Sequence, residues 1–215
     1  MASDFPETLL LLVRHGQARA DDGSYGPETP LSELGQHQAE KLAHALSRAP
    51  APVAVYASPF ARALATATPL CQRLSLSPVL DPRLREFELG ATFLHEAQQR
   101  PDLVLWKPDH RGVQGGETLE EFSLRVAAAC TEVVERHQGE CVAIFAHAGT
   151  IDAAIRWSVG LAPNTTWQHE FDLTNASITE IVVWPRGRVP GGAPRYVFLR
   201  RIADVAHLGE LVSDL

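Results

Sequence analysis

Short apolar runs alternate along the chain with longer segments in which apolar residues recur at helical spacing. Residues 8–13 (TLLLLV), 52–58 (PVAVYAS) and 141–146 (CVAIFA) are apolar almost throughout, without a polar residue at every second position. Such continuous runs are typical of strands that are buried on both faces of a sheet. A further short strand is expected within residues 77–87, before the chain turns into a loop. The pattern therefore predicts the inner strands of a covered sheet.

Helical periodicity follows most of these runs. The predicted helices span residues 31–46, 59–74 and 150–160, together with a long helix that runs from Thr118 to about His137. Ser32 is suited to cap the first helix, and Pro59 is suited to the first turn of the second. Thr118 and Glu121 have the spacing of a capping box at the start of the long helix.

Two further strands are expected near the end of the chain. Residues 176–184 (ASITEIVVW) alternate, which predicts a strand with one polar face. Turn residues at 187–194 lead into a strand at 195–202, so this pair is expected to be antiparallel.

The order of these elements predicts the fold class. Strands and helices alternate over most of the chain, which favours an α/β fold of three layers, with a mostly parallel central sheet and helices on both faces. No linker divides the sequence, so residues 1–215 are predicted to form a single domain. Residues 88–116 contain a possible helix at 91–100 among several prolines and glycines, and are expected to form a loop-rich excursion.

Composition argues against some partners and locations. Lys and Arg total 19 against 26 Asp and Glu, a net charge of −7, which argues against broad binding of nucleic acid or an anionic membrane. No run approaches the roughly 20 apolar residues that a membrane-spanning helix needs, and no signal peptide is recognisable. The three cysteines (Cys71, Cys130 and Cys141) are far apart, which favours free thiols and a cytoplasmic protein.

Polar and titratable residues follow the ends of four predicted strands. They are Arg14, His15 and Gly16 after the first, Arg62 in the helix after the second, Arg83, Arg85, Glu86 and Glu88 after the third, and His147, Ala148 and Gly149 after the fourth. Ligands of such sheets bind beyond the carboxyl ends of the strands, so these residues are expected to share one rim. Each alone is more often an ordinary loop or surface residue, and only their joint occurrence predicts a site.

This combination of side chains suits phosphate chemistry. Arginine donates paired hydrogen bonds to a phosphate, and a histidine that is neutral near pH 7 can attack as a nucleophile. A carboxylic acid can protonate the leaving oxygen and later accept a proton from water. No spacing such as HExxH indicates a metal site, and an arginine-rich cluster would repel a cation. We therefore expect neither a metal nor a cofactor.

Several segments around these residues form an ordered set of motifs. They are VRHGQA, LSELGQHQA, ASPFARALATA, LREFELG, GGETLEEF, AHAGTI, NASITEI and ADVAHL. Over nearly the whole chain this set resembles the histidine phosphatase superfamily, which contains cofactor-dependent phosphoglycerate mutases and many phosphomonoesterases. The resemblance implies a phosphoglycerate mutase-like fold, with residues 88–116 as a cap over the active site.

The resemblance also implies the residues that carry out the reaction. His15 is implied to be the nucleophile that becomes phosphohistidine, and Gly16 is expected to leave room for the phosphate. Glu86 is implied to donate a proton to the leaving alcohol and then to act as the base for water. Glu88 stays open as an alternative acid, although Glu86 follows the motif's leucine and arginine directly.

A second group of residues is implied to bind the phosphoryl oxygens. Arg14 and Arg62 are implied to clamp these oxygens, and His147 is implied to assist them as an imidazolium. The side chain of Gln17 and the backbone N–H of Ala148 are expected as further donors to the substrate.

The chain departs from the family pattern at several positions. Asp21 and Ala203 stand where the family often has Asn, and residues 91–93 (ATF) replace Trp-Glu-Gly. The segment EFELG also lacks the Arg, His and Tyr of the mutases' Glu-Arg-His-Tyr-Gly. This difference favours a metal-independent phosphatase that hydrolyses a small phosphomonoester. A mutase-type phosphotransferase and a catalytically silent phosphate-binding regulatory module are the alternatives.

The sequence does not identify the alcohol part of the substrate. Candidate contacts by position alone are Tyr25, Phe93, Trp106, Lys107, His110, Arg111 and His207. Sugar phosphates, nucleotides, phosphoglycerate and cobalamin-precursor phosphates all stay open. A dimer is common in the resembled family, so a small phosphorylated substrate and a second copy of the chain are the expected partners.

Overall fold

The computed structural model describes residues 7–19, 26–48, 50–88, 107–109, 111, 116–168, 170–184 and 196–213. Three predictions therefore lie outside the described residues. They are the possible helix at 91–100, the turn at 187–194 and most of the excursion at 88–116.

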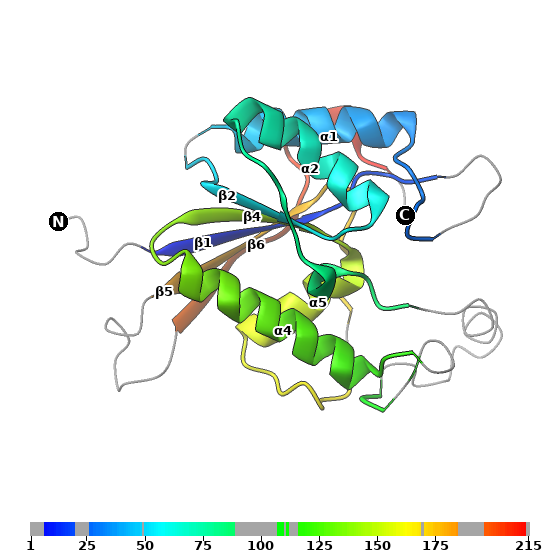
Figure 1. Cartoon of the computed structure of the whole chain (residues 1–215), viewed down its shortest axis with the longest axis vertical. Helices are drawn as coiled ribbons and strands as arrows, with labels where there is room; N and C mark the ends of the chain where they lie inside the picture. The colour runs from blue at the N-terminus through cyan, green and yellow to red at the C-terminus, as the bar shows by residue number, and fades with distance from the viewer. Residues whose placement is uncertain are drawn as a thin grey trace.

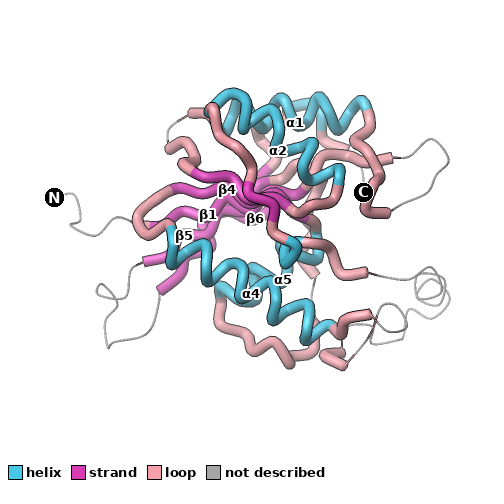
Figure 2. Tube along the Cα trace, viewed as in Figure 1, coloured by secondary structure: helices cyan, strands magenta, loops and turns pink. Residues whose placement is uncertain are grey.

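Within these ranges the strands form one sheet, in the order β3–β2–β4–β1–β5–β6 (Figures 1 and 2). The strands are β1 Thr8–Arg14, β2 Ala54–Ala57, β3 Val79–Leu80, β4 Cys141–Ala146, β5 Ile178–Trp184 and β6 Tyr196–Asp204. β4 pairs in parallel with both β1 and β2, and β2 pairs in parallel with β3. β5 is antiparallel to both β1 and β6. The predicted sheet, mostly parallel and with an antiparallel final pair, is confirmed.

Helices cover both faces of this sheet (Figure 1). The helices are α1 Glu33–Leu46, α2 Ala61–Leu74, α4 Leu119–Arg136 and α5 Ala148–Ser158, with short 3-10 turns η1 at Pro82–Leu84 and η4 at Gly209–Leu211. In Figure 1, α1 and α2 lie above the sheet and α4 and α5 lie below it. The three layers are therefore α1 and α2, the sheet, and α4 and α5.

β1 contributes to the cores on both faces of the sheet. Leu10 and Leu12 belong to the apolar cluster that includes α4 and α5, whereas Leu11 and Val13 belong to the cluster with α1 and α2. Successive side chains of a strand point to opposite faces, so a strand covered on both sides has no exposed position for a polar residue. β1 therefore gives rigid support to the residues that follow Val13.

The predicted caps form at two helices, but Pro59 lies outside its helix. The Ser32 side chain accepts from the N–H of Gly35 at the start of α1, and Thr118 and Glu121 form the capping box of α4. Each such cap contributes about 1 kcal/mol of helix stability. α2 begins only at Ala61, because Phe60 has an extended backbone whose N–H donates to the Ser58 hydroxyl at 3.3 Å.

The short strand expected within residues 77–87 is confirmed as Val79–Leu80, both exposed at the edge of the sheet. The prediction for β5 was wrong in detail. β5 has no polar face exposed to solvent, because even Glu180, whose side chain carries a carboxylate, is buried. Arg200 and Arg201 of the neighbouring strand cover this carboxylate, with N–O distances of 2.7 and 3.0 Å.

The loop after β1 packs directly against the start of α1, where two glycines meet. A Cβ placed on Gly16 would lie 2.7 Å from the carbonyl oxygen of Gly35, and one placed on Gly35 would lie 2.0 Å from that of Gln17. Both clashes would be with backbone atoms, which cannot move aside by a change of rotamer. The expected role of Gly16 is therefore corrected. The space that a side chain at this position would enter is filled by the backbone of α1 and not by the phosphate, and the glycine permits this close approach.

This contact gives a stability prediction. Gly35→Ala is expected to lower the free energy of unfolding by about 3 kcal/mol, the upper end of overpacking penalties, because backbone must shift to admit the methyl group. Urea unfolding followed by circular dichroism measures the effect. Gly26→Ala is the matched control, because a Cβ there meets nothing within 4 Å, and it should change stability little. Equal stability of the two variants would contradict the proposed contact.

Candidate active site

The carboxyl ends of β1, β2 and β4 bring three predicted segments together. The N–H of His15 donates to Ala146 at 3.0 Å, and the N–H of Ser58 donates to Phe145 at 2.9 Å. These bonds continue the parallel ladder one residue beyond each strand. The rings of His15 and His147 therefore lie edge to face, with centroids 5.2 Å apart.

The imidazole of His15 is held at both ring nitrogens. Nδ1 lies 2.7 Å from the carbonyl oxygen of Gly16, and Nε2 lies 3.1 Å from Nε of Arg62. A carbonyl oxygen only accepts and a guanidinium only donates, so Nδ1 carries the proton and Nε2 presents its lone pair. His15 is thereby fixed in one tautomer.

The surroundings of His15 also keep it neutral. Burial lowers the pKa of His15 to about 3, and the cations Arg62 and Arg14 act in the same direction, against the opposing effect of the Gly16 hydrogen bond. A charge on this imidazole is unfavourable because it would be desolvated and beside like charges. His15 is therefore uncharged at neutral pH, and its Nε2 lone pair accepts the hydrogen bond from Arg62.

Two residues that were quoted in motifs without a role hold the loop around His15. Thr66 accepts from the N–H of Gly16 at 3.0 Å and donates to the carbonyl oxygen of Arg62 at 2.7 Å. Asn175 donates from its side chain to the carbonyl oxygen of His15 at 3.2 Å. The motifs ARALATA and NASITEI pointed to these positions, but only the fold shows which backbone groups they bind.

Both predicted arginines lie beside His15. Arg62 is only 3% exposed, and its Nη1 donates to the carbonyl oxygen of Gly26 at 2.8 Å. Arg14 is half-buried, and its Nη1 donates to the carbonyl oxygen of Leu173. Burial is the main cause of the lowered pKa of His15 and His147, and both cations lower these two pKa values further, whereas for Glu86 they only limit the rise in pKa that burial causes.

His147 precedes the first turn of α5 and is almost fully buried. Its Nε2 lies 2.8 Å from the Ser58 hydroxyl, and its ring packs against Phe60 with centroids 5.1 Å apart. α5 begins at Ala148, two residues before the predicted start, because His147 itself occupies the N-cap position. Nδ1 is buried and has no hydrogen-bond partner among the described residues.

The charge expected on His147 differs from what its surroundings favour. Burial lowers the pKa of His147 well below the usual value, and His15, Arg62 and Arg14 lower it further. Since these neighbours are cationic or titrate to cations, the imidazolium form needs an anion beside it. The implied imidazolium therefore requires the charge of a bound phosphate.

Glu86 lies against the first turn of α5. Its Oε2 accepts from the N–H of Gly149 at 2.9 Å, and its Oε1 accepts from the N–H of Phe87 at 2.9 Å. Burial raises the pKa of Glu86, while these hydrogen bonds and the cations Arg62 and Arg14 limit the rise. A Cβ on Gly149 would lie 2.6 Å from Oε1, so the glycine admits the carboxyl group. Glu88 is exposed, which favours Glu86 of the two candidate acids.

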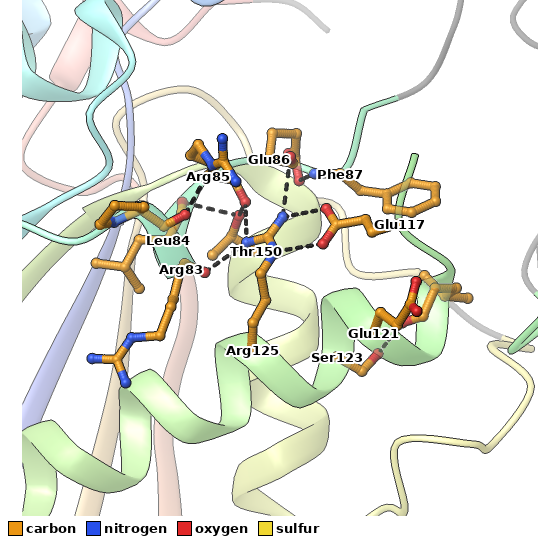
Figure 3. Close-up of polar contacts among 12 residues, drawn as sticks. Arg83, Leu84, Arg85, Glu86, Phe87, Glu117, Glu121, Ser123, Arg125 and Thr150 are labelled. Carbon is orange, nitrogen blue, oxygen red and sulfur yellow. Dashed lines mark hydrogen bonds and ion pairs between the residues drawn. The ribbon is translucent and has the colours of Figure 1, made fainter. Parts of the chain in front are cut away.

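A further residue, which sequence reasoning missed, holds the segment that carries Glu86 (Figure 3). Nη1 of Arg125 on α4 donates to the carbonyl oxygens of Arg83 and Arg85 at 2.6 and 2.7 Å, and Nη2 donates to that of Glu86 at 3.3 Å. Glu117 binds the other side of the same guanidinium, with Nε to Oε2 at 2.7 Å. Three hydrogen bonds from one guanidinium thus join the segment to α4 while the same group also binds Glu117, a geometry that lysine cannot reproduce.

The other residues that were predicted to contact the substrate lie less close to the centre of the site. Oε1 of Gln17 accepts from the Ser32 hydroxyl at 2.7 Å, and Ala148 is the first residue of α5. Lys107 and Arg111 are exposed. His207 lines a cavity with Ile178 and Asp204, which pair with each other beside the carboxyl end of β1, and its role as a leaving-group contact stays a prediction. Tyr25, Phe93, Trp106 and His110 lie outside the described residues.

Two general properties complete the description of the site. Within the described ranges, no three His, Cys, Asp or Glu side chains gather as a metal ion would require. No helix in the described part of the chain is long and apolar enough to cross a membrane.

Cys71, Cys130 and Cys141 are buried free thiols, as predicted.

Comparison with known proteins defines the class to which this fold and site belong. A family model described as the histidine phosphatase superfamily (branch 1) matches residues 10–190. The chain therefore belongs to this superfamily, and its homologues are phosphatases and phosphoglycerate mutase-like proteins. The predicted family, the fold and hydrolase class are confirmed.

Individual relatives match over nearly the full chain. A protein of Hydrogenobacter thermophilus named putative phosphoserine phosphatase 2 is 31% identical over 209 residues, which is 93% of this chain and 98% of its own. The solved structure of Bacillus stearothermophilus YhfR superposes with a TM-score of 0.71 at 28% identity, covering 94% of this chain and 99% of its own. A complex of mycobacterial glucosyl-3-phosphoglycerate phosphatase with inorganic phosphate gives 0.71 at 25% identity, covering 93% and 98%.

The Arg125 contacts lead to a prediction about backbone protection. Arg125→Ala is expected to speed hydrogen exchange at residues 83–87 by about tenfold or more, because the segment loses its bonds to α4. Mass spectrometry of deuterated peptides measures this. Arg136→Ala on the same helix is the control, since that exposed side chain pairs only with Glu132 among the described residues. Unchanged exchange at 83–87 in Arg125→Ala would show that the segment is held by other contacts.

Proposed function

We propose that the protein hydrolyses a small phosphomonoester without a metal, through a phosphohistidine formed at Nε2 of His15. The observation that carries this proposal is the pair of hydrogen bonds on the His15 ring, from Nδ1 to Gly16 and from Arg62 to Nε2. They leave a neutral imidazole whose lone pair faces a buried guanidinium. A phosphoryl group brought to Nε2 would meet a nucleophile and, when the Arg62 N–H turns from Nε2 to a phosphoryl oxygen, a cationic donor beside it.

The first step transfers the phosphoryl group to His15. The Nε2 lone pair attacks phosphorus, and the bond from phosphorus to the alcohol oxygen breaks. Glu86, whose protonated form burial favours by raising its pKa, gives its proton to the departing oxygen. As the Nε2 lone pair forms the bond to phosphorus, the Arg62 N–H that donated to Nε2 donates to a phosphoryl oxygen instead.

The second step reverses these roles with water as the nucleophile. The Glu86 carboxylate takes a proton from water, whose oxygen attacks phosphorus while the bond to Nε2 breaks. Inorganic phosphate leaves, and Glu86 and His15 return to their first protonation states. Catalysis in both steps rests on position and on charge stabilisation, which phosphoryl transfer chiefly requires.

The remaining residues would hold the phosphoryl oxygens. Arg14 and Arg62 supply the positive charge, and the Nδ1 atom of buried His147 gains a partner if a phosphate oxygen lies beside it. A phosphate dianion would also raise the pKa of His147 and so favour its imidazolium form. The N–H of Ala148, at the start of α5, and the amide of Gln17 are proposed as further donors.

The comparisons support hydrolysis as the reaction class. Two of the three relatives above carry names of phosphatases, and one of these is a complex with inorganic phosphate. We further propose that the enzyme works in a reducing cytoplasm, where its buried cysteines stay thiols, and that it forms homodimers as the resembled family often does.

The test compares two leaving groups in matched variants. In Glu86→Gln, transfer from ethyl phosphate is expected to fall by about 10²–10⁴-fold, because ethoxide needs a proton. p-Nitrophenolate needs little protonation, so p-nitrophenyl phosphate should still give a stoichiometric burst of p-nitrophenol, followed by slow turnover. Rapid-mixing absorbance measures the burst. Equal losses of the first step on both substrates would remove Glu86 as the acid.

His15→Gln provides the second part of this test. The variant should lose the burst and steady turnover by about 10³-fold or more, because the nucleophile is gone. Excess EDTA should leave the wild-type rate unchanged. Retained turnover in His15→Gln, or a loss in EDTA, would contradict the proposed mechanism.

A further inference from the structure

A cavity of about 230 Å³ lies between α4, α5 and the segment around residues 167–171. Its inner end is formed by Glu86, Ala148 and Gly149, so it begins at the proposed acid and at the first turn of α5. A leaving group that is protonated by Glu86 has this cavity directly beside it. The cavity is therefore placed to hold the part of the substrate that becomes the alcohol.

The walls of this cavity are apolar and largely aromatic. They are formed by Phe87, Leu119, Phe122, Trp167 and Phe171. The rings pack on one another, with centroids 5.4 Å apart for Phe87 and Phe122, and 6.2 Å for Phe122 and Trp167. An apolar cavity of about 150 Å³ is enough to hold benzene, so this one has room for a ring or a short chain.

Among the described residues that line the cavity, the charged groups are acidic. Besides Glu86, the carboxylates of Asp152 and Glu170 line it, and none of the described lining residues is Lys, Arg or His. Asp152 is already satisfied, because its Oδ1 accepts from Arg156 and its Oδ2 accepts from the N–H of Phe171 at 3.1 Å. Glu170 is exposed and adds a negative charge at the rim.

The nearby cation Arg156 does not line this cavity, and its charge is paired with Asp152. Its guanidinium stacks on the Trp167 ring at 4.3 Å and lines a separate cavity on which Trp167 also borders. The ring of Trp167 thus separates Arg156 from the leaving-group side. A carboxylate on the alcohol would enter apolar surroundings beside Glu170, without a cationic partner from these walls.

We infer that this cavity selects the substrate: the preferred phosphomonoester carries an uncharged alcohol with an apolar ring or chain, and carboxylated substrates such as phosphoserine are disfavoured. This inference rests on the proposed function, since it needs Glu86 to face the leaving group. It separates the chain from what the names of its phosphoserine phosphatase and glucosyl-3-phosphoglycerate phosphatase relatives suggest.

The test uses three phosphomonoesters of primary alcohols: 2-phenylethyl phosphate, ethyl phosphate and O-phosphoserine. Phosphate release from the wild type should give a kcat/KM for 2-phenylethyl phosphate about tenfold above that for ethyl phosphate and about 100-fold above that for O-phosphoserine. Phe171→Ala should reduce the preference for phenylethyl over ethyl about fivefold, mainly through KM.

A charge reversal tests the acidic rim separately. Glu170 is exposed. The substitution Glu170→Lys should raise kcat/KM for O-phosphoserine by about fivefold, because it places a cation at the cavity. Glu135→Lys, an exposed position of α4 outside the cavity, makes the same change in net charge and should leave all three values unchanged. Equal gains in both variants would mean that net charge, and not the cavity, governs the preference.

The outcomes distinguish this inference from the proposed function. If all three esters release phosphate through His15 but O-phosphoserine is turned over as well as 2-phenylethyl phosphate, the inference is overturned and the proposed function stands. If none of the three releases phosphate, the proposed function fails and the inference fails with it.

Discussion

The site depends on how the ring of one buried histidine is held. The Gly16 carbonyl fixes the proton of His15 on Nδ1, and Arg62 faces the lone pair on Nε2. The rest of the fold keeps these two groups in place. β1 is covered on both faces, and Gly16 and Gly35 let the loop after β1 pack closely against α1. Thr66 of α2 forms a hydrogen bond with the backbone of this loop. This imidazole stays neutral within a cationic site because burial and the arginines oppose its protonation.

The same electrostatics separates the roles of the titratable groups. Burial lowers the pKa of both histidines and raises that of Glu86, so desolvation favours the neutral form of all three groups. The fixed positive charge is left to Arg14 and Arg62. In the proposed mechanism, an arriving phosphate dianion meets preorganised cations, an uncharged imidazole and a carboxyl group whose neutral form is favoured by burial. Arg125 supports this arrangement from α4 by holding the backbone on which Glu86 lies.

Much of the fold and the central residues could be predicted from the sequence, because they follow from periodic patterns and strand ends. The run at 141–146 matched β4 residue for residue, and Thr118 formed the predicted capping box. Patterns failed where a distant partner decides the outcome. Glu180 is buried because Arg200 and Arg201 cover it, Gly16 is required by Gly35, and Arg125 acts on a segment about 40 residues away. Such contacts have no periodic signature in the sequence.

The central claim is that Nε2 of His15 receives the phosphoryl group, and phosphorus-31 NMR tests it most directly. Glu86→Gln, loaded with p-nitrophenyl phosphate, should accumulate the phosphoenzyme because water lacks its base. The account predicts one phosphohistidine resonance with the chemical shift of the Nε2 isomer, and peptide mass spectrometry should place it on His15. A resonance of the Nδ1 isomer, phosphate on His147, or the absence of any phosphohistidine would contradict the account.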